Sequence, residues 1–192
     1  MADLLDAAFG HPRGLLGRLG GLIMERGNAE EERRAVALAA VRPGETVLVI
    51  GPGPGIGLAE AARVAGSGGR VIGVDPSATM REMAARRSMN ADVRDGTAEH
   101  TGCAESEVDA AVSVNNVMLW DLAAGLAELH RVLKPGGRLV IAAHRHVLRQ
   151  SFVELARSVE SAGFEILRLH SRKRRANSDA VVLLARKPPM GE

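Results

Sequence analysis

The sequence predicts an α/β fold built on a mostly parallel sheet, and three observations support this prediction. Residues 47–50 form an apolar run typical of a strand that is buried on both faces. A glycine-rich turn follows directly, and an Ala-rich helix is expected over residues 58–64. Strand and helix patterns then alternate to about residue 162, with two further strands after them. This is the order in which a parallel sheet with helices on both faces is built.

Composition limits the class of protein. With 192 residues, 46% hydrophobic and 25% charged, the chain is expected to form a soluble globular protein. A net charge of +2 does not by itself favour nucleic acid, and the single Cys103 excludes an internal disulfide and a Cys-rich metal site, so no metal is predicted. No stretch reaches the roughly 18 apolar residues of a membrane span. The first residues also lack the apolar core of a signal peptide, so we expect a cytoplasmic protein without membrane contacts.

Residues 1–41 are predicted to form an N-terminal helical cover that precedes the main domain over residues 42–192. Leucines and an isoleucine recur at helical spacing between residues 13 and 26, but several glycines make this segment a poor isolated helix. Two interpretations are open. The segment covers a ligand site, or it is a packing arm.

The turn after the first strand carries Gly51, Gly53 and Gly55, a G-x-G-x-G pattern. Glycines let a ligand approach the backbone, and the N-terminus of the following helix offers free N–H groups. Neither the G-x-G-x-x-G fingerprint of dinucleotide binding nor the G-K-[ST] end of a P-loop is present. An ordinary tight loop is the alternative.

The second strand, expected over residues 70–75, ends on a carboxylate. Asp75 follows Gly55 by 20 residues, and an acid at this place is suited to accept the hydroxyls of a ribose. Its alternative role is to cap the helix expected over residues 77–89. A short strand over residues 91–94 and a loop over residues 95–99 come next, with no full crossover helix before the strand at residues 108–114.

Polar side chains follow the fourth and fifth strands. Asn115 and Asn116 follow the fourth strand, at the edge where parallel sheets bind ligands, and the alternative for one of them is to cap the next helix. Trp120 either walls a substrate pocket or packs under the helix expected over residues 121–132. After a turn over residues 133–138 and a strand over residues 139–143, His144 and His146 are candidates for a general base, or else solvated loop residues.

A helix over residues 151–162 and two strands over residues 164–170 and 180–185 complete the prediction. The last two strands suit an antiparallel hairpin. The basic run at residues 172–175 is interpreted as a solvated hairpin tip, with phosphate contact as the alternative.

Taken together, these motifs resemble the class I S-adenosylmethionine-dependent methyltransferases over roughly residues 45–186. The similarity is greatest to the small bacterial type 11 and ubiquinone/menaquinone-biosynthesis-like members. It rests on the glycine turn, Asp75, the D-G-T-A-E loop at residues 95–99 and, most specifically, L-K-P-G-G-R-L at residues 133–139. The resemblance implies a Rossmann-like seven-stranded sheet of order 3-2-1-4-5-7-6, with strand 7 antiparallel and helices on both faces.

The resemblance also implies S-adenosyl-L-methionine as the cofactor and assigns residues to it. The glycine loop would hold the methionine part, Asp75 the ribose, the 95–98 loop the adenine, and the end of the fourth strand would lie near the methionine end. The predicted cofactor-binding residues are Gly51, Pro52, Gly53, Gly55, Asp75, Pro76, Gly96, Thr97, Ala98, Asn115 and Asn116. The predicted substrate-pocket residues are Asn28 and Trp120.

Two positions depart from the family pattern. Val49 stands where the family usually has Asp or Glu, and Thr97 follows Gly96 where the family often has Asp. Both departures remove polar partners for the cofactor, so either backbone groups compensate or cofactor binding is weakened.

The predicted function is transfer of a methyl group from S-adenosylmethionine to a small-molecule acceptor, with His144 or His146 as the base where the acceptor must lose a proton. The first alternative is a non-catalytic S-adenosylmethionine-binding or scaffold protein with a partly degenerate site. A nicotinamide oxidoreductase is disfavoured by the missing fingerprint, and a nucleic-acid acceptor by the small net charge. A homodimer remains open.

Overall fold

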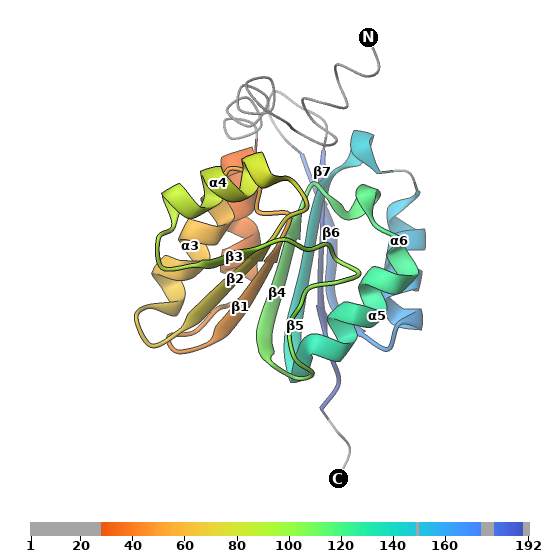
Figure 1. Cartoon of the computed structure of the whole chain (residues 1–192). Helices are drawn as coiled ribbons and strands as arrows, with labels where there is room; N and C mark the ends of the chain where they lie inside the picture. The colour runs from red at the N-terminus through yellow and green to blue at the C-terminus, as the bar shows by residue number, and fades with distance from the viewer. Residues whose placement is uncertain (1–27, 149, 174–178, 190–192) are drawn as a thin grey trace.

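The computed structural model describes residues 28–148, 150–173 and 179–189, and these residues form a seven-stranded sheet of order β3-β2-β1-β4-β5-β7-β6 (Figure 1). β7 runs antiparallel to β5 and β6, and the other pairs are parallel. This confirms the predicted topology. The strands are β1 (Thr46–Ile50), β2 (Arg70–Val74), β3 (Asp92–Arg94), β4 (Val108–Val114), β5 (Leu133–His144), β6 (Glu165–Arg172) and β7 (Ala180–Arg186).

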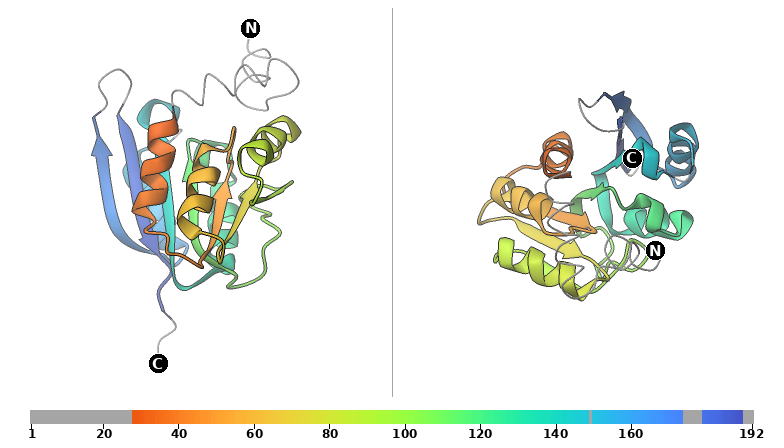
Figure 2. Two further views of the ribbon diagram at one scale, coloured as in Figure 1. Left: turned by 90° about the vertical axis from the view of Figure 1, so that its left-hand side faces the viewer. Right: turned by 90° about the horizontal axis from the view of Figure 1, so that it is seen from above.

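Helices cover both faces of the sheet (Figure 2). α5 (Leu122–Val132) and α6 (Phe152–Ser161) lie on one face, and α3 (Ile56–Ala65) and α4 (Ala78–Arg87) lie on the other, together with a helix over residues 28–38. Each face has its own apolar cluster. Leu126, Leu129 and Leu155 belong to the first, whereas Val36, Val49 and Leu58 belong to the second.

Only part of the predicted N-terminal cover can be placed, because residues 1–27 lie outside the described residues. The helix over residues 28–38 packs on the sheet through Ala35 and Val36, which are 2% and 1% exposed. At its C-terminal end, Arg138 of β5 donates to the carbonyl oxygens of Ala39 (3.0 Å) and Ala40 (3.2 Å). The helix is therefore fixed against the sheet at both its apolar face and its end.

The start of β5 differs from the prediction. We expected a turn over residues 133–138, but β5 already begins at Leu133, which pairs with Val108. The next pair is Arg138 with Ala110, so the register shifts and the residues between bulge out of the ladder. Gly136, with φ 79°, allows this bulge. The glycines therefore make a turn-like bulge within a strand.

Three helices begin at side chains that satisfy free backbone N–H groups. Ser77 accepts from the N–H of Met80 at the start of α4, and Asp121 accepts from that of Ala124 at the start of α5. Ser151 and Glu154 form a capping box at α6. The start of each of these helices is therefore set by the local sequence.

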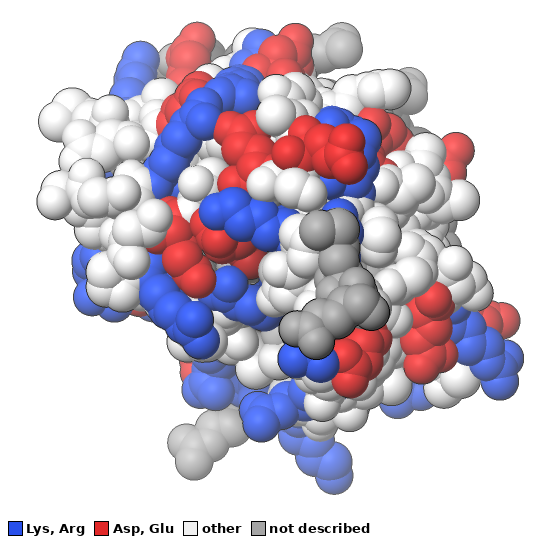
Figure 3. All heavy atoms as spheres, turned by 90° about the horizontal axis from the view of Figure 1, so that it is seen from below, with Lys and Arg blue, Asp and Glu red and all other residues white. Residues whose placement is uncertain are grey.

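The amino ends of the strands form a charged face on which basic and acidic side chains alternate (Figure 3). Arg138 pairs with Glu45 at 2.6 Å, and Lys134 pairs with Asp109 at 2.8 Å. Asp109 also accepts the N–H of Thr46 at 2.8 Å. These contacts join β1, β4 and β5 at the edge opposite to the cavity described next.

Candidate functional site

A cavity of about 560 Å³ opens at the carboxyl ends of β1, β2 and β4. The chain crosses from one side of the sheet to the other between β1 and β4, and open α/β sheets bind ligands at such a switch point. The volume lies within the range of about 300–1,000 Å³ for small-molecule pockets. The residues that line it are Asn28, Glu32, Ile50–Pro54, Val74–Met80, Thr97–Glu99, Val114–Asn116, Leu119 and Trp120.

Glycine is required at the three positions of the turn for different structural reasons. All have positive φ (58°, 51° and 89° at Gly51, Gly53 and Gly55), which favours glycine. A Cβ at Gly51 would overlap the side chain of Asn116, and one at Gly55 would lie 2.7 Å from the Cα of Ala84 in α4. A Cβ at Gly53 would meet nothing within 4 Å. Gly51 and Gly53 line the cavity, whereas Gly55 is packed behind it as the N-cap of α3.

Asp75 is a buried carboxylate at the end of β2 and is 7% exposed. Its Oδ1 accepts the N–H of Ser77 (2.9 Å) and its Oδ2 accepts that of Gly53 (3.3 Å). Burial raises the pKa of the Asp75 carboxyl to about 6, and the two N–H donors offset this only in part. Ser77, not Asp75, is the N-cap of α4. The capping alternative for Asp75 is therefore wrong, and its carboxylate lines the cavity.

The loop after β3 forms another wall. Thr97 and Ala98 line the cavity as the sequence predicted, with Pro76 and Met80 on the α4 side. Gly96 is not among the lining residues. A Cβ at that position would lie 2.8 Å from the carbonyl oxygen of His100, so Gly96 is needed for the path of the loop.

The two adjacent asparagines have separate contacts. Asn116 accepts from the hydroxyl of Ser113 (2.6 Å) and from Nε1 of Trp120 (3.1 Å), and its Nδ2 donates to the carbonyl of Ile50. Its amide therefore joins the ends of β1 and β4. This contact set gives Asn116 a structural role at the base of the cavity.

Asn115 connects three segments. Its Nδ2 donates to Oδ1 of Asn28 (2.9 Å), and its Oδ1 accepts the N–H of His144 (2.7 Å). Asn115 has φ 55°, a left-handed conformation that Asn tolerates. It therefore ties the helix over residues 28–38 and the end of β5 to the end of β4, beside the cavity.

Both predicted substrate-pocket residues, Asn28 and Trp120, line the cavity. Trp120 also packs on α5, because a Cβ at Gly125 would lie 3.2 Å from its ring. The two interpretations of Trp120 are thus compatible: its ring is both part of the wall and part of the packing under α5.

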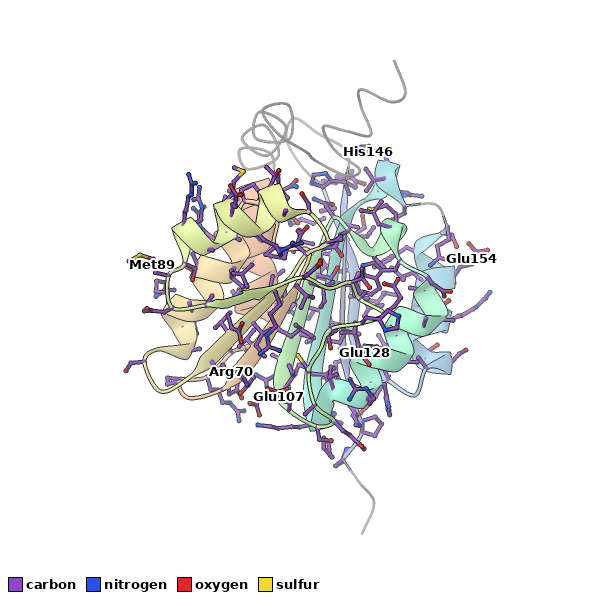
Figure 4. The ribbon with its side chains drawn as sticks, viewed as in Figure 1. Arg70, Met89, Glu107, Glu128, His146 and Glu154 are labelled. Atoms are coloured by element: carbon purple, nitrogen blue, oxygen red, sulfur yellow. The ribbon has the colours of Figure 1, made fainter. Side chains whose placement is uncertain are left out.

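His144 and His146 lie at the end of β5 and in the 3₁₀ turn η3 (Arg145–Val147), and neither lines the cavity. Their rings stack with centroids 5.7 Å apart. Figure 4 shows His146 at the carboxyl end of the sheet, far from Arg70 and Glu107 at the opposite end. The backbone N–H of His144 donates to Asn115, which lines the cavity.

Several lining residues had no predicted role in the site, among them Glu32, Met80 and Leu119. Glu32 follows Asn28 by four residues, so the two side chains share one face of a helix, and that spacing is a signal that the sequence offered. Glu99 accepts the N–H of Asp121 at 2.7 Å, a contact between distant segments that no local pattern reveals.

The described part of the chain contains neither a metal-binding cluster nor a membrane-spanning helix. No group of three or more His, Cys, Asp or Glu side chains is placed there to hold a metal ion. The helices of the same residues include none that is long and apolar enough to cross a membrane.

Comparisons with known proteins agree with this geometry. A family model described as a methyltransferase domain matches residues 48–141. The uncharacterized methyltransferase YdaC of Bacillus subtilis is 30% identical over 64% of this chain and 69% of its own length. The ubiquinone/menaquinone biosynthesis C-methyltransferase UbiE of Rubrivivax gelatinosus is 37% identical over 57% of this chain and 43% of its own length.

A solved structure extends the likeness to nearly the whole chain. The complex of the Haloferax volcanii Trm112 methyltransferase activator with a methyltransferase contains a chain that superposes with a TM-score of 0.76 at 19% identity, covering 90% of this chain and 94% of that one. At such an identity the likeness concerns the fold, which is that of the class I methyltransferases. The chain belongs to the S-adenosylmethionine-dependent methyltransferase family. It spans 35% and 43% of the length of two curated relatives that it matches.

The cavity fits the cofactor of this family. A buried carboxylate, Asp75, can accept ribose hydroxyl groups, and the open space beside Gly53 leaves room for a ligand against the backbone. Met80, Ala98 and Trp120 add apolar surface to the lining of the cavity, as an organic cofactor requires.

Proposed function

We propose that this protein transfers a methyl group from S-adenosylmethionine to a small-molecule acceptor. The observation that supports the proposal most directly is that one cavity gathers the glycine turn, Asp75, the 97–98 loop and the end of β4. These four features come from separate parts of the chain, and the family resemblance assigns each of them to a different part of the same cofactor.

The residues of the chain would divide the work as follows. Asp75 accepts the ribose hydroxyls, Thr97 and Ala98 border the base, and the Gly51–Gly53 backbone borders the methionine part. Asn115 and Asn116 fix the geometry of this end, because their amides join β1, β4, β5 and the helix over residues 28–38. The bound cofactor supplies a methyl group that its sulfonium already activates.

Catalysis would therefore consist largely of positioning, which alone can supply a large share of a rate enhancement. A base is required only for an acceptor that must lose a proton before it attacks. His144 and His146 remain our candidates, since His144 lies next to Asn115 and a histidine titrates near neutral pH. Because neither ring lines the cavity, an acceptor would have to extend toward η3 to be deprotonated by them.

Two features favour a small acceptor. The cavity is concave and of the size of a metabolite pocket. A relative with 37% identity is named for methylation in quinone biosynthesis, which concerns a small molecule.

The test is transfer of a labelled methyl group from S-adenosylmethionine to a panel of quinols, phenols, amines and thiols, with Asp75→Asn as the matched control. Turnover on any acceptor, lost in the control, is the expected result. Binding of S-adenosylhomocysteine without turnover on the panel would favour the alternative, a non-catalytic cofactor-binding protein. Val49, which puts a valine where the family has an acid, is the observation behind that alternative.

A further inference from the structure

We propose that Glu32 is the carboxylate that binds the α-ammonium group of the cofactor, and that the helix over residues 28–38 is therefore part of the cofactor site. The proposal rests on the function proposed above. It assigns a ligand contact to a residue outside the sheet and outside the glycine turn.

Glu32 enters the cavity at the methionine side. It lines the cavity together with the Gly51–Pro54 turn, and its Oε2 accepts the N–H of Gly57 at 2.6 Å. Gly57 lies in the first turn of α3, directly after the glycine turn. The carboxylate is thus held beside the backbone that borders the amino-acid part of the cofactor.

Within residues 28–148, 150–173 and 179–189, no other element supplies an anion at this place. The side chains of Val47, Leu48, Val49 and Ile50 in β1 are apolar and at most 5% exposed. Of the other two acids that line the cavity, Asp75 is at the end of β2 and Glu99 is in the loop after β3, where it accepts the N–H of Asp121. A cationic ammonium in a half-closed cavity needs an anionic partner, because an unpaired buried charge is costly.

The position of Glu32 is preorganised. Val49 and the apolar side of the helix belong to the same cluster, so the helix approaches β1 from the face on which Val49 lies. One turn earlier, Asn28 accepts from Asn115, and at the far end Arg138 binds the carbonyl oxygens of Ala39 and Ala40. A carboxylate offers about four lone-pair positions, so Glu32 can hold Gly57 and accept from an ammonium at the same time.

The proposal is tested with Glu32→Gln in the full chain, by calorimetric titration with two ligands. S-adenosylhomocysteine carries the α-ammonium, and methylthioadenosine keeps the adenosine and sulfur but lacks the amino-acid part. The amide oxygen of Gln can still accept from Gly57, whereas the negative charge is lost. We expect the affinity for S-adenosylhomocysteine to fall by about tenfold to a hundredfold, the value of a charge-assisted hydrogen bond, and that for methylthioadenosine to change little.

Glu30→Gln is the matched control, because it removes the same charge from the same helix at a side chain that is 61% exposed and pairs with Arg34. It is expected to leave both affinities unchanged. If Glu32→Gln lost the same affinity for both ligands, Glu32 would act only through Gly57 and the proposal would be overturned. An unchanged affinity for S-adenosylhomocysteine would overturn it as well. If the wild-type protein bound neither ligand, the proposed function itself would fail.

A measurement on the wild-type protein covers the case in which Glu32→Gln does not fold. The deaminated analogue of S-adenosylhomocysteine, with hydrogen in place of the amino group, is expected to bind about tenfold to a hundredfold more weakly than S-adenosylhomocysteine. Equal affinities would show that no anion recognises the ammonium, and the assignment of Glu32 would be wrong.

Discussion

The two halves of the sheet differ in what they contribute. The β3-β2-β1-β4 half ends in the cavity, and its central strands are buried, with β1 and β2 each exposing little beyond their first residue. Among the described residues, none of β5, β6 or β7 lines the cavity. β6 is an edge strand that leaves Leu167 and Leu169 46% and 41% exposed.

In this one continuous sheet, the β3-β2-β1-β4 half borders the cavity and the β5-β7-β6 half supports it. The chain reverses its direction of winding between β1 and β4, and the cavity opens at the ends of these strands. The antiparallel half closes the sheet and supplies Arg138, which fixes the end of the helix that carries Glu32. The variants below test whether ligand binding and support are separated in this way.

The largest effect is expected from the two histidines. Because both lie on the β5 side of the sheet, a loss of turnover would show that this side takes part in catalysis and does not only support the fold. Replacing His144 and His146 by alanine should lower kcat by about a hundredfold or more if one of them acts as general base. The dissociation constant for S-adenosylhomocysteine should not change, because neither ring lines the cavity. Full turnover by the double variant would remove both residues from the chemistry and leave the β5-β7-β6 half purely supportive.

Next in size is the packing of the glycine turn. Gly55→Ala combines φ 89° with a Cβ that would lie 2.7 Å from the Cα of Ala84, and we expect it to lower the free energy of unfolding by about 2–5 kcal/mol. Gly66→Ala, at the other end of α3, has φ 68° and ψ −173°, a conformation that is essentially restricted to glycine, but its Cβ would meet nothing within 4 Å, so a smaller loss of about 1–3 kcal/mol is expected. Denaturant unfolding of both variants measures the difference. Equal losses would contradict the packing of α3 on α4.

Asp75 should make cofactor binding depend on pH. In the proposed contact the ribose hydroxyls donate to the charged carboxylate, so affinity for S-adenosylhomocysteine should be constant well above pH 6 and should fall as the pH drops through about 6, the raised pKa of Asp75. Asp75→Asn should bind about tenfold to a hundredfold more weakly and lose this pH dependence. Asp109→Asn, at the amino end of the sheet, should keep both affinity and pH profile, since Asp109 contacts Thr46 and Lys134. Identical pH profiles for wild type and Asp75→Asn would contradict the ribose contact.

The same carboxyl affects the stability of the ligand-free protein in the opposite direction. Because folding raises the pKa of Asp75 from 3.8 to about 6, the folded protein binds this proton more tightly than the unfolded chain. Its contribution to stability is therefore greatest below pH 3.8 and is lost as the pH rises through about 6. Ligand binding and stability thus respond with opposite sign, and this contrast separates the two effects in a melting experiment.

The smallest effect is expected from replacing either of two glycines, Gly53 and Gly102, by alanine. Gly53 and Gly102 have φ 51° and 67°, and a Cβ at either would meet nothing within 4 Å. Alanine should therefore cost each about 1–2 kcal/mol of stability. Only Gly53→Ala should weaken S-adenosylhomocysteine binding, by about tenfold or more, because only Gly53 lines the cavity. Equal binding by both variants would place the ligand elsewhere.

The sequence predicted the parts of this molecule that are set by local pattern. The apolar run before Gly51, the carboxylate that ends β2 and the helix predicted over residues 121–132 each depend on a few neighbouring residues, and the structure agrees with them. Strand order required the family resemblance, because no local pattern specifies which strands pair.

Contacts between distant segments could not be predicted. The bond between Glu32 and Gly57 spans 25 residues and forms only when the N-terminal helix packs beside α3. Asn115 and Asn116 look equivalent in the sequence, but Asn115 has φ 55° and the two amides bond different partners. The early start of β5 was missed because its bulge looks like a turn when read alone.

The central claim is that the cavity between β1 and β4 binds S-adenosylmethionine. It is tested most directly by calorimetric titration of the purified chain with S-adenosylhomocysteine, with NAD as the control ligand. We expect a micromolar dissociation constant for S-adenosylhomocysteine and no heat of binding with NAD. Binding of NAD, or of neither ligand, would contradict the claim.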